Sequence, residues 1–255
     1  MDDRSGRPGD DSTSADSGAD VGGVAGLLLH APMTVLGRMP WSSNATFLVD
    51  FDTTSNPADI DSHAPGIRGV YKPGAGEQPL WDFPSGLWRR EVASYELSNA
   101  MGLDVVPLTV RREHGPFGEG SVQLFIDARF DEHYFTIREM ESDHLDNQLR
   151  VLCAFDLIAN SADRKGGHTL IDQADHIWGI DNGLTFHTEL KLRTVIWDFA
   201  EEPFPPMVQK ALEDLQIAGP PDSISDLLSA QELEAMLHRT ELLINSGGYP
   251  SDPSG

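Results

Sequence analysis

Four residues in separate segments of the chain could together carry out phosphoryl-transfer chemistry. They are Lys72 at the end of the run GVYK, Glu91 in the helical pattern that follows, Asp163 in NSADRKGGH, and Asp181 in WGIDNG. Phosphoryl transfer needs a cation on the nucleotide phosphates, a carboxylate that holds this cation, metal-binding carboxylates and a group that orients the acceptor hydroxyl. The four residues supply one side chain for each need.

Each of these residues would have an ordinary explanation if it stood alone. A lone lysine at a strand end is usually solvated, and a single glutamate on a helix is usually exposed. The prediction therefore depends on the order of the four segments and on the elements between them, which must bring the side chains together.

The first half of the chain shows the alternation typical of short strands, with one helical pattern among them. The predicted strands are 24–31, which we expect outside the main sheet, 45–51, 67–73, 105–110 and 121–126. The predicted helix covers 85–102, with Ser85 as its N-cap and Gly102 at its end. We therefore expect a sheet that presents Lys72 and a helix that presents Glu91.

Helical patterns dominate the second half, around one small hairpin. A long amphipathic helix covers 143–162, two short strands flank a polar turn within 168–181, and late helices cover 203–216 and 223–245. A β-rich half followed by a helical half predicts an α+β fold with two lobes that meet near residue 127. Its predicted parts are a disordered acidic tail (1–22), a nucleotide-binding N-lobe (23–126), a C-lobe with the catalytic and metal-binding loops (127–248) and a disordered end (249–255).

The chain is strongly acidic. Its 255 residues hold 41 Asp and Glu against 18 Lys and Arg, a formal net charge of −23, and the predicted tail, with six Asp and two Arg, accounts for only −4 of it. Nucleic-acid binding and stable attachment to an anionic membrane both depend on Lys and Arg, so we expect neither. The only cysteine, Cys153, excludes an intrachain disulfide, and the start MDDRSG lacks the basic region of a secretion signal, so we expect a cytoplasmic location.

Six segments of the chain, taken in order, resemble the phosphatidylinositol 3-/4-kinase-like family. They are WSSNATFLV, VYKP, REVASYELSNAMGLDVVPLTV, GSVQLFID, DLIANSADR and IDNGLTF, which together extend from residue 41 to residue 186. The pattern is most similar to that of the type II phosphatidylinositol 4-kinases and of the small actinobacterial members of the group. The resemblance implies a two-lobed protein-kinase-like fold, here with a reduced C-lobe, and an ATP-dependent kinase that uses Mg²⁺ or Mn²⁺.

The resemblance implies how the nucleotide is held. Lys72 would contact the ATP phosphates, and Glu91 would pair with Lys72. Backbone N–H groups of a serine-rich loop would lie over the phosphates, and the connection between the lobes would hold adenine through backbone groups and apolar side chains. The loop residues are Ser42, Ser43 and Asn44, and the residues of the connection are Gln123, Leu124, Phe125 and Ile126.

The resemblance also implies which residues act on the acceptor and the metal. Asp163 would orient or deprotonate the acceptor hydroxyl, and Asp181 would bind the metal ion. Lys165, two residues after Asp163, would reach the γ-phosphate, although an exposed loop lysine is an equal alternative. Arg164 would brace the loop rather than contact substrate.

The chain departs from the family pattern at His168. The family loop continues from Asp-Arg through three variable residues to an Asn that binds Mg²⁺, and His168 takes the place of that Asn. An imidazole nitrogen suits Mn²⁺ or Zn²⁺ better than Mg²⁺. Three interpretations stay open: His168 is a metal ligand with Mn²⁺ favoured, it is a structural residue near the site, or it marks a weakened, pseudokinase-like site.

The acceptor is not identified by the sequence. Lipid kinases carry basic residues for the inositol phosphate headgroup in the segment after Asp181, and this chain offers only Lys191 and Arg193 there. We therefore expect a kinase that acts on a hydroxyl of a soluble protein or metabolite. A kinase for phosphatidylinositol or another inositol compound, and a nucleotide-binding scaffold without catalysis, are the alternatives. A metal-dependent hydrolase would leave Lys72 and Glu91 without a role.

Overall fold

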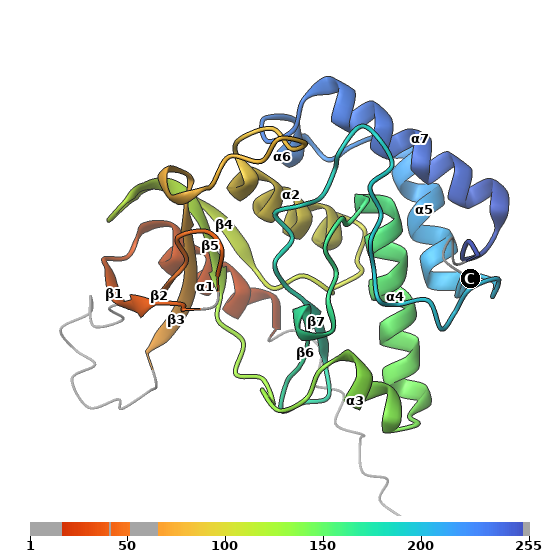
Figure 1. Ribbon diagram of the computed structural model, residues 1–255, viewed down its shortest axis with the longest axis horizontal. Helices are drawn as coiled ribbons and strands as arrows, with labels where there is room; N and C mark the ends of the chain where they lie inside the picture. The colour runs from red at the N-terminus through yellow and green to blue at the C-terminus, as the bar shows by residue number, and fades with distance from the viewer. Residues whose placement is uncertain (1–16, 41, 52–65, 252–255) are drawn as a thin grey trace, which may run out of the picture.

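The computed structural model describes residues 17–40, 42–51 and 66–251. The chain forms two lobes, one built on a sheet and one built on helices (Figure 1). The first lobe contains a five-stranded antiparallel sheet in the order β1-β2-β3-β5-β4. Its elements are α1 (Ser17–His30), β1 (Met33–Arg38), β2 (Phe47–Phe51), β3 (Ile67–Pro73), η1 (Gly74–Gly76), α2 (Leu87–Ala100), β4 (Thr109–Gly115) and β5 (Gly118–Leu124).

The second lobe is mostly helical. A two-stranded antiparallel hairpin lies beside two of its helices, α3 and α4 (Figure 1). The elements are α3 (Tyr134–Glu139), α4 (Asp143–Ala159), η2 (Gly166–His168), β6 (Thr169–Ile171), β7 (Ile177–Gly179), α5 (Pro206–Ala218), α6 (Asp222–Ser225) and α7 (Ala230–Ser246). The expected α+β, two-lobed arrangement is therefore present.

Strand β3 directs two neighbouring side chains to opposite faces of the sheet. Successive side chains of a strand alternate between faces. Tyr71 is fully buried in a cluster with Leu28, Val49 and Val122, so the next residue, Lys72, faces the other side, where α2 lies. The alternation of the strand therefore places Lys72 toward the second lobe.

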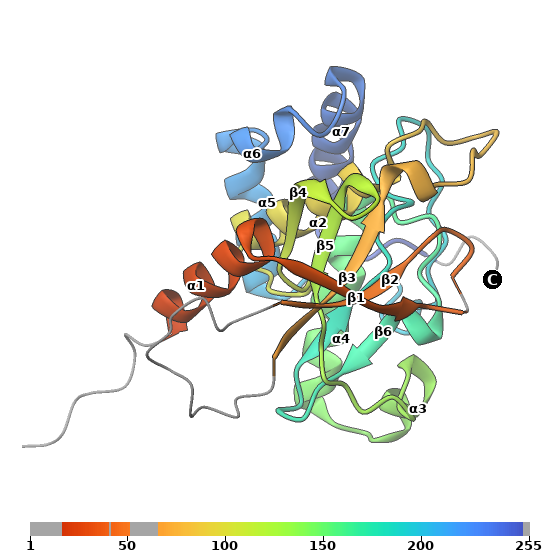
Figure 2. The ribbon, with the colours of Figure 1, turned by 90° about the vertical axis from the view of Figure 1, so that its left-hand side faces the viewer.

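The strand predicted over 24–31 is wrong, because residues 24–30 belong to helix α1. Figure 2 shows α1 running beside the sheet, and its apolar residues Val24, Leu27 and Leu28 have the three-to-four residue spacing of a buried helix face. Arg112 donates hydrogen bonds to the carbonyls of Leu28 and Ala31 at 3.0 and 2.8 Å and so satisfies the helix end. The helix begins at Ser17, inside the segment predicted to be a disordered tail, and residues 1–16 lie outside the described residues.

Helix α2 does not begin with the predicted cap. Its N-cap is Gly86, with a left-handed φ of +89°, rather than Ser85. The carboxylate of Glu77 accepts hydrogen bonds from the N–H groups of Gly86 and Trp88 at 2.8 and 2.7 Å. A distant carboxylate therefore satisfies the free N–H groups of this helix end and fixes the start of the helix that carries Glu91.

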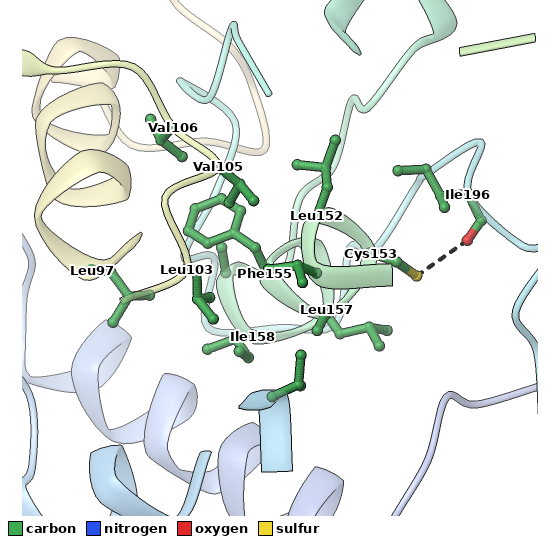
Figure 3. Packing of buried hydrophobic residues seen from close by; sticks show 14 of the residues in the cluster. Leu97, Leu103, Val105, Val106, Leu152, Cys153, Phe155, Leu157, Ile158 and Ile196 are labelled. Atoms are coloured by element: carbon green, nitrogen blue, oxygen red, sulfur yellow. Dashed lines mark hydrogen bonds between the residues drawn. The ribbon is translucent and has the colours of Figure 1, made fainter. Parts of the chain in front are cut away.

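Helix α4 is the centre of the larger hydrophobic core. Figure 3 shows Leu152, Phe155 and Ile158 of this helix among apolar side chains from α2 and the segment after it. Cys153 is buried in the same core and its Sγ donates to the carbonyl of Ile196 at 3.3 Å. The helix ends at Asn160, in the left-handed conformation, and the loop with Asp163 follows directly.

The end of the described chain packs against the second lobe. The prediction of disorder from residue 249 onward therefore does not hold for Tyr249. Tyr249 is buried against the rings of Phe199 and Phe204, and its hydroxyl donates to the carbonyl of Arg150 at 2.7 Å. An aromatic ring buries enough apolar surface to order a chain end. Residues 252–255 lie outside the described residues.

Candidate active site

Lys72, Glu91 and Asp181 meet between the two lobes. Lys72 Nζ donates to Glu91 Oε1 and, at 2.8 Å, to Asp181 Oδ1. Glu91 is only 2 % exposed, whereas the side chain of Asp181 is 51 % exposed. Lys72 lies near the end of β3, Glu91 in α2 and Asp181 just after β7. The structure thus brings together three of the residues singled out from the sequence, with Asp181 on the open side.

Lys72 and its two carboxylate partners stabilise one another's charged forms. Burial alone would lower the pKa of Lys72, but Asp181 and Glu91 outweigh it and raise the pKa well above the usual lysine value. The ammonium of Lys72 in turn holds the pKa of Asp181 well below the usual range, against the opposing effect of burial. Lys72 is therefore positive and Asp181 negative across the physiological pH range.

The backbone at Asp181 is in the left-handed region, with φ +58°. This conformation is costly for most residues other than glycine, although Asp and Asn tolerate it best, and such positions gather at functional sites. The next residue holds it in place, because the N–H of Asn182 donates to Glu91 Oε2 at 3.1 Å and its side chain donates to the carbonyl of Gly179 at 3.0 Å. Glu91 therefore contacts both Lys72 and the backbone beside Asp181.

Arg164 braces the loop that carries Asp163. Its guanidinium is buried and bonds to both oxygens of Asp156 at 3.0 to 3.2 Å. It also donates to the carbonyl of Ile180 at 2.7 Å and to Asn182 Oδ1 at 2.6 Å. These contacts match the expectation that Arg164 braces the loop, and they tie the Asp163 loop to the segment of Asp181.

His168 faces Asp181 with a nitrogen that carries no proton. The Nδ1 atom of the ring lies 2.9 Å from the carbonyl of Asp163, which can only accept, so Nδ1 carries the proton. Nε2 lies 3.4 Å from Asp181 Oδ2. Burial lowers the pKa of His168, although Asp181 works to raise it, so the imidazole is neutral at neutral pH. Two electron-pair donors thus face each other, an arrangement that a cation between them would satisfy.

The described part of the chain holds no group of three His, Cys, Asp or Glu side chains that could bind a metal ion without other ligands. Asp181 and His168 supply two donors. Mg²⁺ and related ions in kinases commonly take one or two protein ligands and complete their coordination with phosphate oxygens and water. The two residues therefore fit a divalent ion that arrives with a nucleotide.

Asp163 and Lys165 lie together at the edge of the site. Lys165 Nζ donates to Asp163 Oδ2 at 2.8 Å, and the side chain of Lys165 is 64 % exposed. The Asp163 carboxylate is partly exposed, and its carbonyl holds His168. One short loop therefore carries a carboxylate, an ammonium and an imidazole that contact one another through Asp163.

The loop predicted to cover the phosphates packs against the chain that follows β3. Asn44 Oδ1 accepts from the N–H of Gln78 at 2.8 Å, and the carbonyl of Ser43 accepts from the Gln78 side chain at 2.9 Å. Ser42 Oγ lies 2.7 Å from Thr46 Oγ1. These bonds fix the loop beside the residues that follow Lys72.

The predicted connection between the lobes is shifted along the chain. Gln123 and Leu124 belong to β5, which pairs with β3 on one side and β4 on the other. The Gln123 side chain is buried and donates to Thr109 Oγ1 at 3.0 Å. The backbone leaves the sheet at Phe125, whose N–H still bonds to the carbonyl of Arg68, so Ile126 is the first predicted residue beyond the sheet.

Several residues of this site were missed by the sequence interpretation. Asn182, Thr185 and Glu77 look like ordinary loop residues, and their role depends on contacts made far along the chain. The place of Asn182 next to Asp181 was the only available signal.

No helix in the ranges that the structure describes is long and apolar enough to cross a bilayer.

Comparisons with solved structures show the fold. The structure of hydra Fam20 with sugar matches with a TM-score of 0.58 at 12 % sequence identity, over 91 % of this chain and 89 % of that chain. The crystal structure of the golgi casein kinase matches with a TM-score of 0.51 at 14 % identity, over 92 % of this chain and 75 % of that chain. The expected two-lobed, kinase-like fold is confirmed. The narrower resemblance to the phosphatidylinositol 3-/4-kinase-like family stays a prediction.

Comparison with curated proteins shows the family. No family model matches the chain. Protein Rv2133c of Mycobacterium tuberculosis is 32 % identical to it over 267 residues, which span 90 % of this chain and 91 % of the relative. Identity at this level over almost the whole of both chains means that the chain described here, with its kinase-like fold, belongs to the same family as Protein Rv2133c.

Proposed function

We propose that this protein is an ATP-dependent kinase that transfers the γ-phosphoryl group to a hydroxyl of a soluble protein or metabolite. The observation that carries the proposal is the pair of contacts from Lys72 to Glu91 and to Asp181 within a kinase-like fold. A lysine held by a buried glutamate, beside a half-exposed aspartate, is the arrangement that places a fixed positive charge against nucleotide phosphates.

Each residue of the site has a role in this proposal. Lys72 binds the α- and β-phosphates, and Glu91 keeps its ammonium in place. The N–H groups of residues 42–44 lie over the phosphates, and Ile126 begins the segment that holds adenine. Asp163 accepts the proton of the acceptor hydroxyl while the hydroxyl oxygen bonds to the γ-phosphorus and the bond from that phosphorus to the ADP oxygen breaks.

Lys165 has two roles beside Asp163 in this proposal. Its ammonium bonds to the Asp163 carboxylate at 2.8 Å. This contact places a positive charge beside the Asp163 carboxylate, and the flexible lysine stem also allows the ammonium to turn toward the γ-phosphate. A bound divalent ion, held by Asp181 and His168, would neutralise charge on the phosphates.

The facing pair of Asp181 Oδ2 and His168 Nε2 supports the interpretation of His168 as a metal ligand. A purely structural histidine would gain nothing from a second acceptor atom 3.4 Å away. An imidazole ligand favours Mn²⁺ over Mg²⁺ relative to the amide oxygen of Asn. We therefore propose Mn²⁺ as the preferred ion, with Mg²⁺ as the alternative.

The charge of the protein supports a soluble acceptor. At a formal net charge of −23, the protein is repelled by anionic vesicles unless a basic surface lies against them. Of the two cations in the segment after Asp181, Lys191 already pairs with Asp82 at 3.4 Å and with Glu189 at 3.8 Å. An inositol lipid as acceptor stays the alternative that a vesicle assay tests.

The proposed function is tested by nucleotide binding and by phosphate transfer. Purified protein is titrated with ATP in the presence of Mn²⁺ or Mg²⁺, and then incubated with γ-labelled ATP and a lysate of the source organism or phosphatidylinositol vesicles. We expect ATP binding and labelled lysate protein or metabolite, which Asp163→Ala abolishes. Label in the lipid would identify the alternative acceptor. ATP binding without any transfer would indicate a nucleotide-binding scaffold, and the absence of both would contradict the proposal.

A further inference from the structure

Arg90, the residue before Glu91, forms a buried ion pair with a helix from the end of the chain. Arg90 Nη2 bonds to Glu232 Oε1 at the start of α7, and Arg90 Nε donates to the carbonyl of Thr185 at 3.0 Å. The two charged residues are only 3 % and 8 % exposed. We call Arg90, Thr185 and Glu232 the α2–α7 clamp.

The other end of the clamp is also fixed. Glu232 Oε2 accepts from the N–H and the hydroxyl of Ser229 at 2.8 Å each, and Ser229 Oγ accepts from the N–H of Glu232 at 3.3 Å. These bonds form the capping box of α7. One carboxylate therefore closes the helix end with one oxygen and holds Arg90 with the other, so its position follows that of α7.

The clamp and the active site share one short segment. Glu91 accepts from the N–H of Asn182, while Arg90 donates to the carbonyl of Thr185. Between these points, Thr185 Oγ1 donates to the carbonyl of Asn182 at 2.8 Å. Two successive residues of α2 thus anchor both ends of the segment that begins immediately after Asp181. A shift of Arg90 would move this segment and the Lys72–Glu91 pair together.

Stability alone does not call for such a clamp. A buried ion pair can often be replaced by apolar side chains of similar volume without loss of stability, because the desolvation of both charges offsets their attraction. Its directional contacts instead define a single arrangement of the elements that it joins. At this place the elements are α2 with Glu91, the segment that follows Asp181, and α7.

We propose that Arg90, held by Glu232, is a positioning residue that aligns Glu91 and Asp181 for phosphoryl transfer, so that helix α7 takes part in setting the active site. This inference rests on the proposed kinase function. It adds that the last helix of the chain controls the rate of the chemical step through α2, without any contact to nucleotide or acceptor.

The test uses Glu232→Gln in the full chain. Glutamine can form the capping box of α7, so the helix end is kept while the charge that faces Arg90 is lost. We expect kcat to fall at least about tenfold with less than about a twofold change in the KM for ATP, because the reacting groups are misplaced while the nucleotide contacts remain. Glu241→Gln, on the exposed side of the same helix, is the matched control and should leave both constants unchanged.

A second measurement does not depend on turnover. Hydrogen exchange of the ligand-free protein should be faster at the amides of residues 182–185 in Glu232→Gln than in the wild type, with no change in α5. If Glu232→Gln does not fold, Arg90→Lys replaces it, since lysine keeps the charge but cannot donate to Thr185 and Glu232 together in the geometry of a guanidinium. An Arg90→Lys/Glu232→Gln protein should show less than the sum of the two single effects on ln kcat.

The outcomes separate the two proposals. An active wild type with normal kcat and normal exchange in Glu232→Gln would overturn the positioning role and leave the kinase function standing. A wild type without transfer would remove the proposed function, and the exchange data alone would then decide whether the clamp positions the segment. A parallel fall in kcat and rise in exchange, absent from Glu241→Gln, is the result that we expect.

Discussion

Lys72 and Asp181 are 109 residues apart in the chain, and they are joined by a hydrogen bond of 2.8 Å across the two lobes. Glu91 completes the contact, because it bonds to Lys72 with one oxygen and to the backbone N–H of Asn182 with the other. The first lobe thus supplies a charged pair that fixes the segment of Asp181 in the second lobe. The contacts of Lys72 with both carboxylates place its ammonium where the proposed chemistry requires it.

Replacing Glu91 with glutamine should impair transfer more than folding. Glutamine has nearly the same shape and can still accept the bond from Asn182, but it no longer holds the ammonium of Lys72 by charge. We expect kcat to fall at least about tenfold, because electrostatic alignment of the lysine is lost. Steady-state kinetics with ATP, with Glu96→Gln on the same helix as the control, measures this. Equal rates in the two variants would contradict the role given to Glu91.

Replacing His168 with asparagine should change the metal preference. The amide oxygen is a harder donor than imidazole, so we expect the ratio of Mn²⁺-supported to Mg²⁺-supported ATP affinity to fall several-fold. Calorimetric titration of ATP with each metal measures the ratio, and His144→Asn, at an exposed position on α4, is the control. An unchanged ratio would assign His168 a structural role through its bond to the carbonyl of Asp163.

Asp172, in the turn between β6 and β7, should make the free energy of unfolding depend on pH. Burial works to raise the pKa of Asp172, but hydrogen bonds from the Trp178 indole and from the N–H groups of His176 and Ala174 outweigh it and lower the pKa. The carboxylate therefore stabilises the fold above its unfolded-state pKa of about 4. This stabilisation is lost as the pH falls through the lower, folded-state value.

Asp172→Asn should remove that dependence. We expect the free energy of unfolding at pH 7 to fall by about 1 kcal/mol, because one acceptor oxygen becomes an amide group, and the decrease below pH 4 to be shallower than in the wild type. Urea denaturation from pH 2 to pH 7 measures both. Asp175→Asn on the same turn, where the side chain is exposed, is the control, and a wild-type pH profile in Asp172→Asn would refute the assignment.

Cys153 should be unreactive in the folded protein. Burial raises the pKa of its thiol far above the usual value, and the sulfur donates to the carbonyl of Ile196. Thiol reagents attack the thiolate, so we expect the rate of modification to follow global unfolding in urea. Rapid modification in buffer alone would show that the core around α4 opens locally.

The sequence singled out Lys72, Glu91 and Asp181, which the structure brings together, but it misassigned one of the elements of the first lobe. The order of Lys72, Glu91 and Asp181 was informative because a kinase-like fold needs these residue types in that order, whatever the lengths between them. The run over 24–31 was misassigned because a short apolar segment fits a buried helix as well as a strand, and only packing against the sheet decides between them. Leu28 of α1 shows this, since its side chain is fully buried and its carbonyl accepts a hydrogen bond from Arg112, a residue of the sheet.

The α2–α7 clamp could not be predicted, for a different physical reason. Arg90 and Glu232 are 142 residues apart, and each looks like an ordinary charged residue of an amphipathic helix. The late helix predicted over 223–245 begins only at Ala230 in the structure, after the separate short helix α6, and its N-cap is Ser229. Nothing local shows that the second carboxylate oxygen faces Arg90, because only the packing of α7 against the rest of the second lobe brings it there.

The central claim, that Lys72 is the phosphate-binding cation of a kinase, is tested most directly by transfer of label from γ-labelled ATP by Lys72→Met protein. Lys210→Met, which removes an exposed lysine paired with Asp214, is the matched control. The account predicts transfer by the wild type and by Lys210→Met, and none above background by Lys72→Met. Equal transfer by the wild type and by folded Lys72→Met protein would contradict it.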